Sequence, residues 1–448
     1  MQLVNIMMIP KRKLFSLVLL ALPLITFSQE NSPYSRYGIG NLTPQGNILN
    51  RGMGGISAGY SDATSLNYLN PASYGRLYYT TLDIGAQFDS RTLRSKNPEG
   101  KFNTKNGSIS YLQVGFPLLV GNKKALEKKI GWGVNLGLKP VSNIAYKIQR
   151  DSRIANLDSI TTIFEGSGGL NEVFAGTGVQ LKNFAFGVNA GYVFGSKNHG
   201  TRLIFINDTI NYLKSNSATR TSIGGLSLHT GAQYAFSLKK GDTVKGVLRV
   251  GAYARIKKNY NAKQDILRES FSFNAVTGST DPLDSIFERN DQKGTVVLPA
   301  TYGVGFTVEK EHWLYGADFE MTNWDDYTFY GQKDLVANNW TVKAGFQYYP
   351  AKSNSRKYSQ FIRYRAGVSL GPDYIVADKK LPQFLVSIGA GLPLKLRQAY
   401  YETQRSVVNL GLEYGNRGNN SNNLRENMVR ITAGFSLSDI WFRRYKYQ

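Results

Sequence analysis

The side chains that carry enzyme chemistry are few in this chain and are not grouped. It contains three histidines, His199, His229 and His312, and no cysteine. A hydrolytic site needs a nucleophile oriented by a base and a third group. The sequence predicts polar turns around His199 and His312, and no signature surrounds His229 in its strand-like stretch. We therefore expect no enzyme activity.

Metal and cofactor sites are not expected either. No histidine or carboxylate recurs at the spacing of a three-ligand metal site. The lack of cysteine excludes thiolate ligands, disulfides and a lipid anchor on a cleaved cysteine. The glycine-rich run 166–169 lacks the Gly-Lys-Ser/Thr of a phosphate-binding loop. The sequence predicts neither a metal ion nor a cofactor.

Charged residues in alternating stretches are the remaining candidates for chemistry. The charged residues that we expect at the polar, inward-facing positions of these stretches are Arg249, Arg255, Lys343, Arg363, Arg365, Arg430, Asp83, Asp89, Asp318, Glu320 and Glu413. A guanidinium matches a carboxylate with two hydrogen bonds, so Arg363 and Arg365 are candidates for binding a substrate carboxylate. We favour the alternative, a lattice of ion pairs that also includes Arg36, Arg51 and Asp62, because buried charges must be neutralised.

Strands must position these residues, since from Thr80 onwards apolar and polar residues alternate. Six segments alternate cleanly: 81–89, 248–256, 340–348, 362–370, 408–414 and 429–437. Eight looser candidates are 108–118, 130–138, 172–181, 184–194, 219–236, 294–308, 313–321 and 384–392. Segments 144–150, 202–206 and 263–274 could add to or replace one of these fourteen. The count indicates an even-numbered barrel of roughly 12 to 16 strands.

A soluble β-sandwich or propeller would also alternate, but its outer face is usually rich in Lys, Glu and Thr. Here the polar face is mostly Gly, Ser, Thr and Asn with paired charges, and the chain has 28 Tyr and 23 Phe. These features favour an all-β fold, a transmembrane antiparallel β-barrel. Amphipathic aromatics prefer the headgroup level, so we expect Trp313, Trp324, Trp340 and Trp441 to mark strand ends.

The N-terminus predicts export. Lys11, Arg12 and Lys13 precede an apolar run, and Thr26 and Ser28 supply small residues at the two cleavage-defining positions. The run of about 11 residues is short of the ~20 that span a membrane, so we expect a cleaved signal peptide over residues 1–28. We place the barrel at residues 79–448, ending in a short basic and aromatic tail, either an assembly signal or a docking tail.

Residues 29–78 show no sustained period and are rich in Gly, Ser and Asn. We expect this segment to lie inside the barrel as a hatch, with one short helix over 62–69. The predicted extracellular loops are the polar stretches 96–106, 195–200, 257–264, 281–293, 351–357 and 416–423. The net charge of +23 suits outer-membrane lipids and lipopolysaccharide phosphates better than nucleic acid, which an exported chain seldom meets.

Three blocks of the sequence resemble the FadL/TodX outer-membrane transport family. The first is Asp62, Ala63, Thr64 and Ser65 followed by Asn70, Pro71 and Ala72, which is similar to the family's hatch motif. The second and more specific contains Leu298, Pro299, Gly303, Gly305, Trp313, Asp318, Thr322, Trp324 and Tyr327. The third is the closing strand and tail, residues 426–447. The resemblance implies fourteen strands, a hatch in the lumen and localisation to the outer membrane of a Gram-negative bacterium.

It also implies passive uptake of hydrophobic small molecules such as fatty acids or hydrocarbons, through a hatch shift or a lateral gap. An oily ligand needs an apolar pocket, for which the candidates are Met53, Ile56, Tyr60, Leu66, Leu69, Tyr253 and Leu314. The same residues could instead only wedge the hatch in place. PorV-like relatives imply an alternative function, a non-transporting barrel subunit that partners an outer-membrane protein secretion or assembly complex.

Overall fold

The computed structural model describes residues 31–119, 128–155, 158–206, 212–240, 243–273, 280–352, 355–377, 379–394 and 405–441. The predicted signal peptide and most of the C-terminal tail lie outside these ranges. Within them, no helix is long and apolar enough to cross a membrane. The short helical elements are η2 (Pro33–Arg36), α2 (Ile48–Arg51), η3 (Pro71–Arg76), η4 (Trp324–Asp326) and η5 (Tyr358–Phe361).

The described strands form one antiparallel sheet that closes where β19 (Leu424–Asp439) pairs with β2 (Thr80–Lys96). The other wall strands are β3 (Glu99–Pro117), β4 (Ile130–Pro140), β5 (Ser142–Arg153), β6 (Ser159–Leu181), β7 (Phe184–Phe205), β8 (Lys214–Lys240), β9 (Thr243–Arg255), β10 (Lys258–Phe273), β11 (Thr280–Leu298), β12 (Thr301–Lys310), β13 (Trp313–Thr322), β15 (Asn339–Tyr348), β16 (Arg363–Pro372), β17 (Pro382–Leu394) and β18 (Arg405–Arg417). β1 (Asn41–Leu42) and β14 (Thr328–Phe329) are short additions to this wall. Because β4 and β5, β9 and β10, and β11 and β12 each continue one another, the barrel has fourteen strands, as predicted.

An apolar belt surrounds the barrel, and β7 shows its height. Phe184, Phe186, Tyr192 and Phe194 are exposed at alternate positions, and polar residues follow. The ten steps from residue 184 to residue 194, at ~3.3 Å each, span about 33 Å along the strand, which a tilt of about 40° reduces to about 25 Å, the height of a lipid-facing band. Trp313, Trp340 and Trp441 are exposed. Trp324 follows the end of β13, as predicted, but it is buried and so does not lie at the headgroup level.

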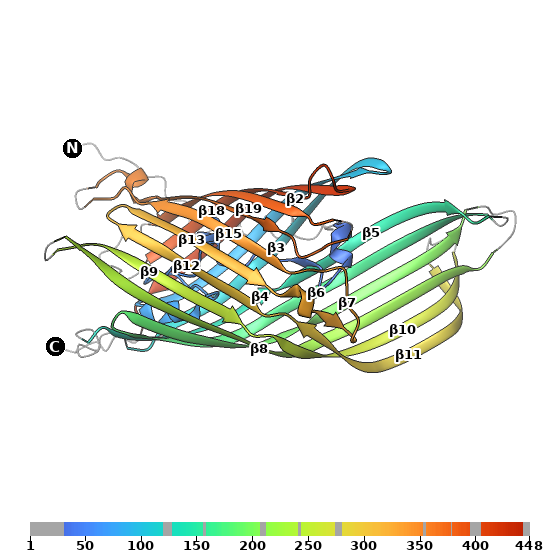
Figure 1. Ribbon diagram of the computed structural model, residues 1–448, viewed down its shortest axis with the longest axis horizontal. Coiled ribbons are helices and arrows are strands. Elements are labelled where there is room, and N and C mark those ends of the chain that lie inside the picture. The colour runs from blue at the N-terminus through green and yellow to red at the C-terminus, as the bar shows by residue number, and fades with distance from the viewer. Residues whose placement is uncertain are drawn as a thin grey trace, which may run out of the picture.

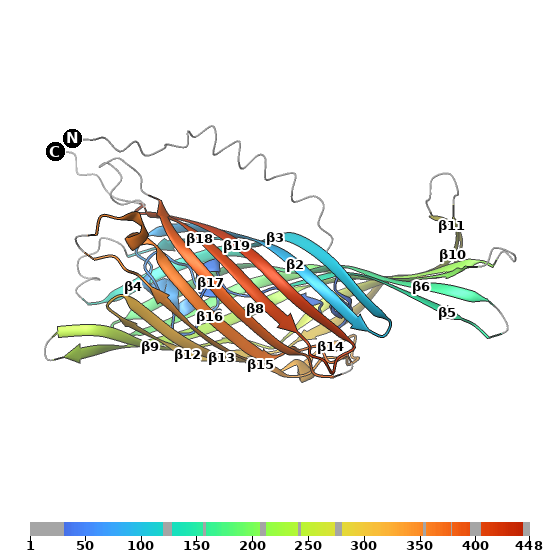
Figure 2. The same ribbon diagram turned by 90° about the horizontal axis from the view of Figure 1, so that it is seen from above.

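Several strands continue well beyond the belt. β5, β6, β7, β8, β10 and β11 extend from the barrel as a six-stranded sheet, which we call the projecting sheet (Figures 1 and 2). It contains the stretches 195–200, 257–264 and 281–293, which were wrongly predicted as loops, and His199, which was wrongly placed in a turn. Outside a membrane both faces of a strand meet water, so apolar alternation no longer marks it.

The other loop predictions were partly wrong. Residues 99–106 belong to β3, and only the turn before them leaves the strands. The stretch 351–357 lies between β15 and β16, at the end of the barrel where β19 ends. The stretch 416–423 lies at the other end of the barrel, where β19 begins. These two stretches cannot both be extracellular.

The wall is interrupted between β3 and β5, an opening that we call the lateral gap. β3 pairs with β4 only from Leu112 to Pro117, and its residues 99–111 pair with β2 alone. At Pro140 the strand loses a backbone donor, and the register then shifts by one residue, because residues 141–143 face only Gly169 and Leu170 of β6. β5 therefore turns away from β3 towards the projecting sheet (Figure 1).

Residues 31–79 lie within the barrel. A large buried cluster at the projecting end joins Tyr34 and Ile39 of this segment to Tyr260 of β10, Trp324 and Tyr374. The helix predicted over 62–69 is absent; the chain there forms a turn with a bridge between Asp62 and Ser65. Contacts with the barrel wall determine the local conformation more than helix propensity does.

Candidate functional site

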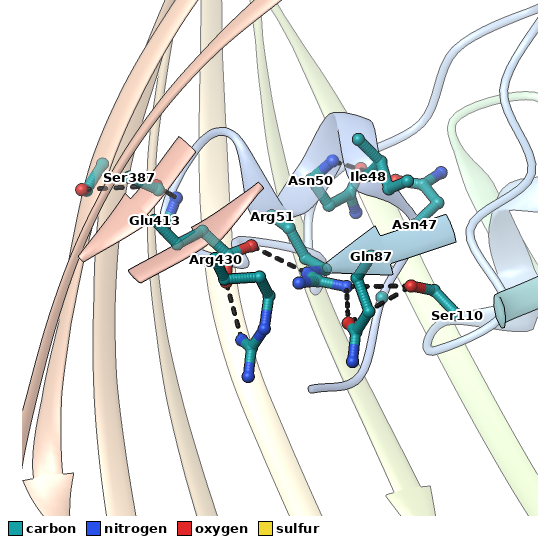
Figure 3. A network of polar contacts seen from close by, with 12 residues as sticks. Asn47, Ile48, Asn50, Arg51, Gln87, Ser110, Ser387, Glu413 and Arg430 are labelled. Carbon is teal, nitrogen blue, oxygen red and sulfur yellow. Dashed lines mark hydrogen bonds and ion pairs between the residues drawn. The ribbon is translucent and has the colours of Figure 1, made fainter. Parts of the chain in front are cut away.

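An ion-pair network holds the N-terminal segment at the centre of the barrel (Figure 3). Arg51, at the end of α2, donates from Nε to Glu413 Oε1 at 2.8 Å and from Nη1 to Gln87 Oε1 at 2.9 Å. The second oxygen of Glu413 accepts from Arg430 Nη1 at 2.7 Å, and Arg430 also pairs with Asp89. The four ionic side chains are almost fully buried. Two cations and two anions thus neutralise one another in the lumen.

The helix that carries Arg51 is fixed at its N-terminus. The side chain of Asn47 accepts from the backbone N–H of Asn50 at 2.9 Å, which caps α2. The same side chain donates to the carbonyl of Leu66 at 2.8 Å. Tyr111 of β3 accepts from the N–H of Ile48 at 3.1 Å. The guanidinium of Arg51 is therefore positioned by both the segment and the wall.

A second clamp explains part of the motif over 298–327. Asp318 of β13 accepts the backbone N–H groups of Ser57 and Ala58 at 2.5 and 2.8 Å. Gly305 leaves room for this carboxylate, since a Cβ there would lie 2.0 Å from Asp318 Oδ1. Gly251 similarly admits the backbone, because its Cβ would lie 1.8 Å from the carbonyl oxygen of Ala58. Gly305 and Asp318 of the motif, together with Gly251 of β9, thus fix residues 57–58 against the wall.

The Asn-Pro-Ala motif forms a third attachment. Asn70 Nδ2 lies 2.7 Å from the carbonyl oxygen of Ala58 and 3.3 Å from two wall carbonyls in β8 and β9. Its Oδ1 accepts from the N–H of Ala72 at 3.2 Å and caps η3, whose first residue is Pro71. One amide side chain therefore joins the segment to two strands.

Protein groups contact both arginines that were predicted to bind a substrate carboxylate. Arg363 Nη1 pairs with Asp62 Oδ2 at 3.3 Å. Arg365 donates to Gln347 at 2.8 Å and to Asn409 at 2.9 Å, and its Nη2 is buried without a hydrogen bond. The favoured lattice of ion pairs is thus present for Arg51 and Asp62. Arg36 instead lies over the ring of Phe164, 4.6 Å from its centroid.

The predicted apolar pocket residues are divided among separate packed clusters. Met53, Ile56, Tyr60 and Leu314 pack together with Leu49. Leu69 packs with Ile48, Tyr68, Tyr111 and Phe174, and Leu66 packs with Tyr74 and Leu77. Tyr253 donates its hydroxyl to Glu320 at 2.5 Å. None of the seven predicted residues lines any of the cavities described next.

Three cavities lie around the segment and the lateral gap. One of about 300 Å³ lies beside Arg51 and is lined by charges of both signs, among them Lys343 and Glu320. A second, of about 630 Å³, lies at the lateral gap between Ser108 of β3 and Ser142 of β5. Residues 41–44 line both cavities. These chambers are polar, unlike the pocket predicted for an oily ligand.

The third cavity is an apolar groove of about 660 Å³ on the outer face. Leu112, Leu138, Tyr192 and Leu226 line it, and all four side chains are exposed. Leu112 and Leu138 are also the last residues paired between β3 and β4 before the gap. The groove therefore adjoins the gap on the lipid-facing side of the wall.

A buried polar cluster was not predicted from the sequence. Glu172 Oε1 accepts from Ser227 Oγ at 2.5 Å and lies 2.9 Å from His229 Nε2, while Lys139 Nζ is 3.3 Å from Oε2. Ser227 bonds to the carboxylate rather than to the histidine, so these atoms do not form a nucleophile and base pair. All four side chains occupy inward positions of neighbouring strands, a signal that alternation alone could have supplied.

Comparisons with known proteins agree with this architecture. A family model described as BamG matches residues 8–448. The crystal structure of the toluene transporter TodX from Pseudomonas putida matches with a TM-score of 0.53 and 16% identity, covering 90% of this chain and 99% of that one. A FadL homologue from Pseudomonas aeruginosa matches with a TM-score of 0.51 and 12% identity, covering 89% and 99%. At these identities the likeness establishes the fold. No curated protein matches the sequence.

Proposed function

Because the chain belongs to the BamG family and has the barrel fold of FadL and TodX, we propose that it is an outer-membrane channel for passive uptake of hydrophobic or amphipathic small molecules. Its setting is the outer membrane of a Gram-negative bacterium, in contact with lipid and lipopolysaccharide. The lateral gap is the observation that carries the proposal, because a wall opening lets a ligand move sideways into lipid without crossing the whole lumen.

The two sides of the gap suit the two ends of an amphiphile. The chamber inside offers hydroxyl and amide groups such as Ser108, Asn106 and Ser142, which suit a polar group. The groove outside offers Leu112 and Leu138, which suit an apolar tail. A fatty acid or a similar molecule would therefore leave the lumen with its tail towards the membrane.

The moving part in this proposal is residues 41–45, whereas the stretch around Ala58 stays fixed. Asp318 and Asn70 fix the stretch around Ala58 by the hydrogen bonds described above. Asn41 and Leu42 hold to the wall through a two-residue pairing with β5. Further hydrogen bonds join Thr43 to Val141 and Gln45 to Lys139. Because residues 41–44 line both the cavity beside Arg51 and the cavity at the gap, displacement of residues 41–45 would join the two cavities and enlarge the gap.

A disulfide tests this route. Leu42 lies directly opposite Ser142, and the natural chain has no cysteine, so Leu42→Cys with Ser142→Cys creates the only possible bridge. Uptake of a fluorescent fatty acid into vesicles should stop when the bridge forms and return on reduction. The control is Thr161→Cys with Ile204→Cys, a paired site in the projecting sheet. Full uptake by the oxidised gap variant would rule out this route.

A second candidate function is a membrane subunit of an outer-membrane protein secretion or assembly complex. The polar, closely packed lumen and the projecting sheet favour it, since neither is required for passage of an oily molecule. Purification from mildly solubilised native membranes separates the two functions. A large partner in stoichiometric amount and no lipid in the barrel supports the subunit, and lipid or alkane density in the gap supports the channel.

A further inference from the structure

One edge of the projecting sheet has no strand beside it. Between residues 281 and 294, β11 pairs with β10 on one side, and no described strand pairs with its other side. Pairing resumes only at Val296 and Val297, which meet β14. Backbone N–H and C=O groups along an open edge can accept another strand.

The opposite edge of the same sheet, β5, is covered by the protein itself over residues 142–147. Asn41 and Leu42 pair with the start of β5, and the N–H of Ser32 donates to the carbonyl of Ala145 at 3.0 Å. Asn31 exchanges two hydrogen bonds with the backbone of Lys147. The two edges therefore differ, and edge-to-edge pairing of β11 with β5 of a second copy would require displacement of this cover.

Two β-bulges in β11 expose apolar side chains beyond the lipid belt. The register against β10 skips one residue of β11 between Asp284 and Pro282 and one between Phe287 and Ser285, leaving Leu283 and Ile286 unpaired. Leu283 is 55% exposed and Ile286 is 73% exposed. Apolar side chains gathered on an exposed edge indicate a contact surface.

The charge along this edge is opposite to that of the whole protein. Between residues 283 and 294, the acidic side chains Asp284, Glu288 and Asp291 outnumber the basic Arg289 and Lys293, whereas the chain carries a net charge of +23. Asp291 meets Lys263 at 3.3 Å on the exposed surface, and Glu288 accepts from Asn290 at 2.7 Å. An acidic edge with apolar side chains is complementary to a basic and apolar partner.

We propose that the free edge of β11, residues 283–294, is a docking site for an extended segment of a partner protein. The segment alternates apolar and basic residues and adds to the projecting sheet as a further strand. Backbone hydrogen bonds supply affinity, while Leu283, Ile286 and the acidic side chains select the sequence. This interaction goes beyond passage of small molecules, because it lies outside the lumen and the gap.

A labelled peptide of about twelve residues that alternates valine and lysine is the probe, measured by fluorescence anisotropy with the full-length protein in detergent. We expect the peptide to bind, and a Val/Glu peptide not to bind. Leu283→Ser with Ile286→Ser should weaken binding at least tenfold. Leu213→Ser with Ile154→Ser, two exposed apolar residues just outside β8 and β5, should leave it unchanged.

N-methylation tests whether the peptide adds as a strand. Alternate N–H groups of an added strand point at β11, so methylating one alternate set should abolish binding and methylating the other should preserve it. The proposal would be overturned if both methylated peptides bound equally well. It would also be overturned if the natural protein and the Leu283→Ser with Ile286→Ser variant bound the unmethylated peptide equally well. A dimer that dissociates on Leu283→Ser with Ile286→Ser would overturn it as well, because the edge would then bind a second copy.

Discussion

Replacing Glu413 by glutamine should release the N-terminal segment from the centre of the barrel. Glu413 accepts from Arg51 on one oxygen and from Arg430 on the other, and all three side chains are almost fully buried. Glutamine keeps the shape but has a single acceptor oxygen, so its NH₂ group faces one guanidinium. Removing one partner of a buried ion pair costs about 3–5 kcal/mol. The fraction of molecules in which the segment is released should therefore increase by a factor of roughly a hundred to several thousand.

Hydrogen exchange measured by mass spectrometry provides the assay, because it reports local opening while the barrel remains closed. Amides of residues 47–58 should lose protection in Glu413→Gln, and those of β16 to β18 should keep theirs. The matched control is Asp291→Asn, which removes the exposed pair with Lys263 and should cost at most about 1 kcal/mol. Unchanged protection of residues 47–58 would falsify the claim that this network holds the segment.

Further substitutions test the other contacts. Gly251→Val should displace the segment, because the added Cβ would meet the carbonyl oxygen of Ala58 at 1.8 Å. The control is Gly200→Val, since a Cβ at Gly200 has no atom within 4 Å. The yield of folded barrel, measured on gels of heated and unheated samples, should fall only for Gly251→Val. Asn70→Ala should increase proteolysis of the segment, since it removes the side chain that joins Ala58 to β8 and β9, and native-like resistance would contradict this. Burial in the projecting sheet lowers the pKa of His199 to about 4, so the unfolded chain binds more protons between pH 6.5 and 4. Amide protection near His199 should therefore fall as the pH is lowered through this range, and His199→Gln should remove the dependence.

The sequence predicted the barrel wall well because each wall residue faces either lipid or the lumen. Segment 340–348, for example, alternates throughout and corresponds to β15. The same reasoning failed for 195–200 and 281–293, where strands continue into water and no oily face is needed. Strand pattern therefore predicts the part of a strand inside a membrane and not its full length.

The sequence predicted which side chains of the candidate site face the lumen, but not which side chains pair with one another. The inward positions of Asp89, Glu413 and Arg430 follow from alternation, and all three are buried. Their pairing with Arg51 depends on the register between distant strands, which one sequence does not contain. The partners of Asn70 are mostly backbone carbonyls, which leave no trace in residue types. The prediction of a helix over 62–69 was wrong for a similar reason, because contacts with the wall outweigh a weak local helix propensity.

The position of the central ion-pair network has a consequence for biogenesis. Asp89 belongs to the first wall strand and Arg430 to the last, and these residues face each other across the junction where β2 meets β19. Arg51 joins the same network through Glu413, contributed by the penultimate strand. Glu413, the carboxylate that neutralises Arg51, therefore becomes available only when the end of the chain has been inserted. Insertion of the segment and sealing of the barrel thus become one late, cooperative step.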